Sequence, residues 1–109
     1  MKSIMDYIKT ESPFENVGIT AEDYMPIDDV LGKKIVIMDV MKFENEKGEG
    51  LYILFEIGDE MRYICTHAIG LVRPFDNIKV VNVVRDEGLE AVIVKRKSMK
   101  SDRMVYAFA

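Results

Sequence analysis

Cys65 and His67 are the two side chains whose types and spacing come nearest to metal or thiol chemistry. They are the single cysteine and the single histidine among 109 residues, and they lie two positions apart. In an extended strand this spacing places both side chains on one face of a sheet. A structural zinc site needs four ligands, and a Cys-His or Ser-His-Asp catalyst would have to use His67. We therefore interpret Cys65 as a core residue and expect no metal site.

The carboxylates and glycines also lack a catalytic arrangement. Asp28-Asp29 and Asp59-Glu60 are neighbours along the chain, and a helix cap and a tight turn explain them. Gly48-Glu49-Gly50 lacks the lysine and the hydroxyl residue of a phosphate-binding loop. The sequence therefore predicts a protein that is not an enzyme and that needs no cofactor.

Basic and aromatic residues form the other group with chemical potential. Binding of single-stranded nucleic acid takes cations for the phosphates and exposed rings for stacking the bases. Strand alternation makes Tyr52 and Arg62 candidates for an outward surface, and Phe43 ends the preceding strand. The predicted nucleic-acid-binding residues are Phe43, Tyr52, Arg62, Lys95, Arg96, Lys97, Lys100 and Arg103. The alternative is that the tyrosine is structural and that the Lys-Arg-Lys run is a solvated strand end.

The charges are unevenly distributed along the chain. The net charge of -4 argues mildly against a nucleic-acid partner. However, residues 1–32 carry two lysines against seven carboxylates, whereas residues 88–109 carry five cations against two carboxylates. We expect an acidic arm that partly screens a basic surface. The alternative is that the arm closes the open end of the fold and keeps the protein soluble.

The elements that would position these residues differ between the two parts of the chain. Residues 1–32 read as short helical turns, with a capping pattern at 12–15 and stop signals at Gly18, Pro26 and Gly32. Such turns are too short to persist alone, so apolar residues of the arm should pack on the rest of the protein. The residues expected to do so are Ile4, Tyr7, Ile8 and Phe14.

The pattern of apolar and turn residues in 33–109 predicts a small β-domain. We expect strands near 34–43, 51–57, 61–67, 89–97 and 103–108. The segment 78–84 has strand propensity, but Ile78, Val81 and Val84 lie at helical spacing, so we predict a helix at about 74–86, beginning near Pro74. Three strands, a helix and a final hairpin is the order of the five-stranded OB-type barrel. The predicted fold is therefore mainly β, with an arm at 1–32 and an OB-type barrel at 33–109.

Three stretches of the sequence resemble a known group of proteins. They are residues 31–40, which begin Leu-Gly-Lys-Lys, residues 89–98, which read Leu-Glu-Ala-Val-Ile-Val-Lys-Arg-Lys-Ser, and the closing residues 105–109. The chain is similar there to small OB-fold, single-stranded DNA-binding-like proteins of Gram-positive phages and mobile elements. The resemblance implies sequence-independent binding of single-stranded DNA in phage or mobile-element replication or recombination.

Partners and location follow from the same observations. No apolar run approaches the ~18 residues of a membrane helix, and a single cysteine favours a reducing cytoplasm, so we expect a cytoplasmic protein without a membrane partner. A homo-oligomer is a further expectation, because a monomer this short would gain affinity from neighbours on one strand. The alternative function is a protein-interaction or structural module that uses the same barrel without nucleic acid.

Overall fold

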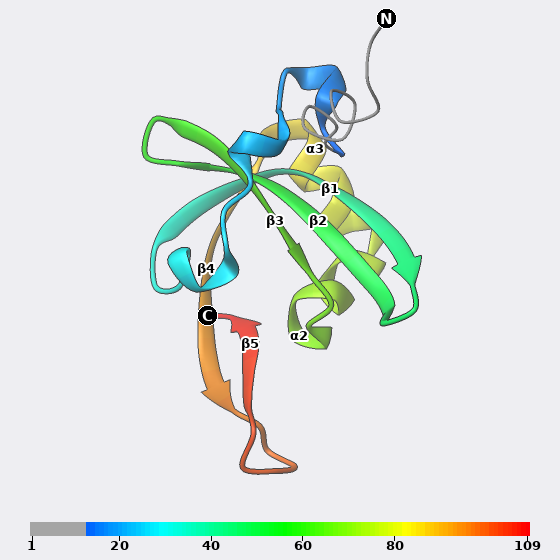
Figure 1. The fold of residues 1–109 in the computed structure, drawn as a ribbon, viewed down its shortest axis with the longest axis vertical. Coiled ribbons are helices and arrows are strands. Elements are labelled where there is room, and N and C mark those ends of the chain that lie inside the picture. The colour runs from blue at the N-terminus through cyan, green and yellow to red at the C-terminus, as the bar shows by residue number, and fades with distance from the viewer. Residues whose placement is uncertain (1–12) are drawn as a thin grey trace, which may run out of the picture.

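Five antiparallel strands in the order β3-β2-β1-β4-β5 form a curled half-barrel (Figure 1). The structure is a computed structural model, and it describes residues 13–109. The strands are β1 (Lys34–Asn45), β2 (Gly48–Ile57), β3 (Glu60–Thr66), β4 (Leu89–Lys97) and β5 (Met104–Phe108). The mainly β class is therefore confirmed. Within the described residues, no helix is long and apolar enough to cross a membrane.

The strong curl of the sheet begins in β1. Its first four residues pair with β4, whereas nearly its whole length pairs with β2, and the register shifts between Ile37 and Asp39. Such a bulge bends a strand and increases its twist. The bulge therefore lets β1 belong to both halves of the sheet, with β2 and β3 on one side and β4 and β5 on the other.

Helical segments connect β3 to β4. They are α2 (Ile69–Val72), the 3-10 turn η4 (Arg73–Asp76) and α3 (Ile78–Glu87). The expected start at Pro74 is wrong, because Pro74 lies in η4 and the side chain of Asn77 caps α3 by accepting a hydrogen bond from the Lys79 N–H. Residues 78–84 are helical, and Val81 and Val84 are the buried residues of α3.

The main core fills the concave side of the sheet. Its buried members from the strands include Ile35, Ile37, Ile53, Phe55 and Ile93, all at most 1% exposed. The helical connection adds Leu71, Phe75, Val81 and Val84 to the same cluster. Gly70 brings α2 close to β5, because a Cβ atom there would lie 2.5 Å from the carbonyl oxygen of Tyr106.

The described part of the arm packs on the sheet through three 3-10 turns. These turns are η1 (Glu15–Val17), η2 (Ala21–Asp23) and η3 (Ile27–Asp29). Phe14 is buried against Tyr63 and Leu54 in a second, smaller core, so its expected packing is confirmed. Ile4, Tyr7 and Ile8 lie outside the described residues. Val30 is fully buried in the main core, so the end of the arm shares the core of the sheet.

Candidate nucleic-acid interface

An aromatic row runs along the face of β1, β2 and β3 that is turned away from the main core. This outer face carries Met41, Phe43, Tyr52, Leu54 and Tyr63, as the strand register requires. The ring centroids of Phe43 and Tyr52 are 4.6 Å apart, and their planes are tilted by 36°. Both rings are partly exposed. The structure therefore brings together the two residues that the sequence predicted for base stacking.

The position of the Phe43 ring depends on a glycine. Gly50 pairs with Phe43 across β1 and β2, and a Cβ atom at position 50 would overlap the ring. The ring therefore lies over the backbone of β2. His67, which follows β3, meets the edge of the Phe43 ring at a centroid distance of 5.2 Å, and its Nδ1 lies 3.2 Å from the Glu49 carbonyl oxygen. Three rings thus meet at this end of the outer face.

The arm covers the other end of the aromatic row. Tyr63 is 7% exposed and lies edge-on to Phe14 and to Tyr24, at centroid distances of 6.1 and 5.7 Å. Burial raises the pKa of the Tyr63 hydroxyl, and burial is also the main cause of the raised pKa of Tyr52. The part of the outer face open to a ligand therefore ends near Tyr52.

Cys65 lies on the outer face opposite Tyr52. Its thiol is partly exposed, and burial raises its pKa above the ordinary value. A raised pKa leaves less of the nucleophilic thiolate at neutral pH. Among residues 13–109, no group of three or more His, Cys, Asp or Glu side chains could hold a metal ion.

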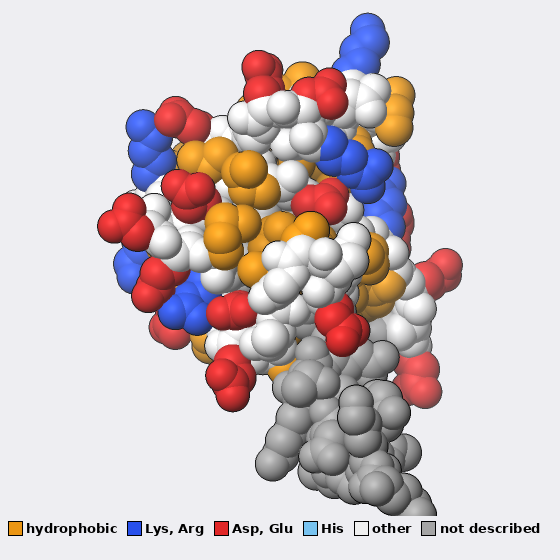
Figure 2. All heavy atoms as spheres, turned by 90° about the horizontal axis from the view of Figure 1, so that it is seen from above, with side chains coloured by type: hydrophobic (Ala, Val, Ile, Leu, Met, Phe, Trp, Pro, Cys, Tyr) orange, Lys and Arg blue, Asp and Glu red, His pale blue; other side chains and the backbone are white. Residues whose placement is uncertain are grey.

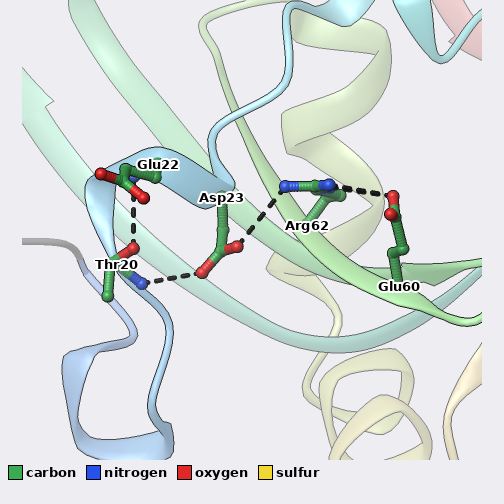
Figure 3. A network of polar contacts seen from close by, with 5 residues as sticks. All are labelled: Thr20, Glu22, Asp23, Glu60 and Arg62. Atoms are coloured by element: carbon green, nitrogen blue, oxygen red, sulfur yellow. Dashed lines mark hydrogen bonds and ion pairs between the residues drawn. The ribbon is translucent and has the colours of Figure 1, made fainter.

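Arg62 lies on the opposite face of β3 from the aromatic row. The register pairs Arg62 with core-facing Phe55, so the expected outward position beside Tyr52 is wrong. Its guanidinium donates to the Glu60 carboxylate at 2.9 Å and forms an ion pair with Asp23 of the arm at 3.5 Å (Figure 3). Asp23 also accepts a hydrogen bond from the Thr20 N–H (Figure 3). Arg62 therefore joins the arm to the sheet.

The remaining predicted cations lie on the β4–β5 hairpin, which projects beyond the core at the bottom of Figure 1. Lys95 is opposite Tyr106, and Arg96 is opposite Val105 on the other face. Arg96 donates to the Phe108 carbonyl oxygen at 2.9 Å. Lys97 shares the face of Lys95 and forms an exposed ion pair with Asp102 at 3.1 Å. Lys100 and Arg103 are exposed in the turn between the strands.

Asp28 of the arm meets the hairpin at Lys95 and Tyr106. The Tyr106 hydroxyl donates to Asp28 Oδ1 at 2.6 Å, and Lys95 Nζ lies 3.4 Å from the same oxygen. Lys95 Nζ also lies 5.2 Å from the centroid of the Tyr106 ring. The hydrogen bond from Tyr106, followed by that from Lys95, lowers the pKa of Asp28, and the hydrogen bond to Asp28 raises the pKa of both partners.

Acidic side chains surround part of the candidate interface. Glu44 and Glu49 line a hollow of about 340 Å³ together with Lys42 and Phe43. Figure 2 shows a hydrophobic patch bordered by Asp and Glu side chains on the face seen from above, with Lys and Arg side chains toward its edges. Phe43 therefore has two carboxylates as well as the Lys42 ammonium beside it.

Sequence reasoning missed Tyr106 as a partner of Lys95, although the hairpin pattern predicted both strands. The missing information was the register, because a shift of one residue moves each side chain to the other face.

No protein-family model, curated protein or solved structure matches this chain.

Proposed function

We propose that the protein is a non-catalytic module that binds single-stranded DNA without sequence preference on an OB-type barrel. The order of the five strands supports this fold, as does the helical connection between β3 and β4. OB-type barrels bind oligonucleotides on strands two and three and on the loops between strands one and two and between strands four and five.

The observation that carries the proposal is the partly exposed pair of rings at Phe43 and Tyr52. The two rings are in contact at a centroid distance of 4.6 Å, so they form one partly exposed aromatic surface on which a base can stack. Stacking on an aromatic side chain contributes about 1–3 kcal/mol per base and tolerates every base, because each base has a π-face. The proposed affinity is therefore indifferent to sequence.

The cations of the β4–β5 hairpin would contact the phosphates. Lys95, Arg96, Lys97, Lys100 and Arg103 are exposed, and the ion pairs of Lys95 and Lys97 involve exposed carboxylates. Exposed pairs contribute roughly 0–1 kcal/mol, so a polyanion can replace their carboxylates. Arg62 is withdrawn from the proposed contact set because it joins the arm to the sheet.

Fluorescence anisotropy with labelled oligo-dT tests the proposal. We expect binding at low salt that weakens at moderate salt, since phosphate contacts release counterions, and we expect weaker binding of duplex DNA. Phe43→Leu and Tyr52→Leu should each weaken binding about tenfold. Tyr24→Leu is the matched control, because that ring is 47% exposed but belongs to the arm and packs on Tyr63, away from the Phe43–Tyr52 pair. Equal affinity for duplex DNA, or no binding at low salt, would refute the proposal.

A second candidate function is a protein-interaction module on the same barrel. The net charge of -4 and the carboxylates of Glu44 and Glu49 beside the aromatic pair favour it. An interaction module would not bind oligo-dT at low salt, which separates the two candidates. A cytoplasmic homo-oligomer is part of the first proposal, and sedimentation with and without oligo-dT tests the oligomeric state.

A further inference from the structure

Lys95 and Tyr106 present two hydrogen-bond donors to one anionic oxygen. The ammonium and the phenol hydroxyl come from paired positions on β4 and β5, and both reach Oδ1 of Asp28, at 3.4 and 2.6 Å. Phosphate oxygens of nucleic acids are bound by the same donors, namely lysine ammonium groups and tyrosine hydroxyls. The pair therefore has the chemistry of a phosphate contact, and the carboxylate lies where a phosphate oxygen would bind.

The backbone of η3 is anchored, whereas the Asp28 side chain is exposed. Val30 is fully buried, and the Gly32 N–H donates to the Ile93 carbonyl oxygen at 2.9 Å. The side chain of Asp28 is 62% exposed and that of Lys95 is 41% exposed. The carboxylate can therefore leave the two donors by a side-chain rotation, without any displacement of the arm.

We infer that Lys95 and Tyr106 form a subsite for one backbone phosphate of the bound strand, and that Asp28 occupies this subsite in the free protein. The inference rests on the proposed function and names one of its contacts. The carboxylate competes with the incoming phosphodiester for the same two donors. The acidic arm therefore lowers the affinity for nucleic acid through a single side chain.

The chain offers a matched control for charge. Asp29 is the next residue and is also exposed and acidic, yet its carboxylate contacts neither Lys95 nor Tyr106. Asp28→Asn and Asp29→Asn remove the same charge from the same turn. A long-range effect of net charge would raise the affinity for oligo-dT equally in both variants. Release of the subsite would raise the affinity further in Asp28→Asn alone.

The experiment compares oligo-dT binding by the wild type, Asp28→Asn and Asp29→Asn over a series of salt concentrations. Asp28→Asn should bind about twofold to fivefold more tightly than Asp29→Asn at low salt, which is the range that an exposed ion pair supports. The slope of log K against log salt should become steeper by at most about 0.7, the value for one full phosphate contact with a single strand, because the carboxylate no longer competes for that contact. Circular dichroism checks that each variant is folded.

A further variant, Lys95→Gln, removes the proposed ammonium donor. It should weaken binding more in the Asp28→Asn background than in the wild type, because the carboxylate no longer masks the lysine. If the wild type binds but Asp28→Asn and Asp29→Asn have the same affinity and slope, the subsite is refuted and the proposed function stands. If neither the wild type nor any variant binds oligo-dT at low salt, both are refuted.

Discussion

The arm contacts the two ends of the sheet in different ways. At β2 and β3 it packs through side chains that are almost fully buried, including Phe14 at 1% and Ile19 at 6% exposure. At the β4–β5 hairpin the contact of Asp28 with Lys95 and Tyr106 is polar and lies near water. Both contacts join the same acidic segment to a surface with basic or aromatic residues.

The apolar contact at β2 and β3 stabilises the fold, whereas the polar contact at the hairpin can be replaced by another anion. Removing a buried apolar side chain exposes a cavity or a hydrophobic surface, and that cost is independent of any ligand. A carboxylate over exposed donors contributes little to stability, and another anion can take its place. The covered end of the aromatic row should therefore respond to mutation in stability, and the hairpin should respond in binding.

Phe14→Ala should produce the largest effect, on stability. The side chain is 1% exposed against Tyr63 and Leu54, and truncation of a buried phenylalanine costs about 3–5 kcal/mol. Urea unfolding followed by circular dichroism measures the loss. Val17→Ala is the control on the same arm, because Val17 is 60% exposed and should change stability by less than about 0.5 kcal/mol. Equal losses in both variants would show that the arm does not seal the outer face.

Gly50→Ala should produce a smaller loss of stability together with a loss of binding. The new methyl group would overlap the Phe43 ring, which must then leave its place beside Tyr52. Overpacking typically costs about 1–3 kcal/mol, and we expect the lower end because the ring is partly exposed. Near-ultraviolet circular dichroism reports the displaced ring, and oligo-dT anisotropy should show weaker binding.

The double variant Gly50→Ala with Phe43→Leu is the control for this clash. The leucine lacks the ring that meets the methyl group, so stability should recover while binding stays weak. A single Gly50→Ala variant with unchanged near-ultraviolet signal and unchanged affinity would contradict the role of Gly50 beneath the ring.

Arg62→Gln and Arg103→Gln remove one positive charge from opposite ends of the sheet. Arg62 pairs with Asp23 and Glu60, so its loss should cost about 0.5–1 kcal/mol of stability and leave oligo-dT affinity unchanged. Arg103 is exposed in the hairpin turn, so its loss should leave stability unchanged and flatten the salt slope by about 0.7. If Arg62→Gln weakens oligo-dT binding and Arg103→Gln leaves the salt slope unchanged, then Arg62 contacts the phosphates and Arg103 does not.

The sequence predicted the positions of the strands and the helix better than it predicted which face of the sheet each side chain lies on. Apolar alternation predicted the strands within a few residues, and Phe43 and Tyr52 were each predicted for base stacking. That Phe43 pairs with Gly50 and contacts the Tyr52 ring was visible only in the structure. Pro74 misled the expected helix start because a proline also suits the 3-10 turn η4, after which Asn77 caps α3. The two local start signals lie three residues apart, and α3 begins after the second of them.

The candidate site was predictable in composition but not in register. The alternation of β3 does not say which of its faces meets the core, so Arg62 was expected outward until its pairing with Phe55 was known. The sequence of the hairpin turn likewise leaves the register uncertain by one residue. The register decides whether Tyr106 or Val105 lies opposite Lys95. The charge asymmetry predicted a contact between the arm and the basic residues of 88–109, and Asp28 makes such a contact with Lys95, whereas the ion pair of Asp23 with Arg62 was not predicted.

The smallest expected effect is on the titration of Tyr106. Its hydrogen bond to Asp28 is the largest cause of the raised pKa of the phenol, and Asp28→Asn removes the charge on that acceptor. The pKa of Tyr106 should therefore fall back toward its ordinary value of about 10. Ultraviolet difference titration measures the change, and Tyr106→Phe identifies the transition by its loss. The raised pKa of Tyr63 has burial as its largest cause and should not move.

The same contact gives a dependence of stability on pH, whose direction follows from the two pKa shifts. The pKa of Tyr106 is higher in the folded protein, so its contribution is complete below about pH 10 and disappears as the pH rises through the folded pKa. The pKa of Asp28 is lowered, so its contribution is complete above the unfolded value near 3.9 and disappears as the pH falls through the folded pKa. Asp29→Asn should preserve the Tyr106 transition of the wild type. If Asp28→Asn also preserves that transition, Asp28 does not contact Tyr106 in solution, and the carboxylate cannot mask the phosphate subsite.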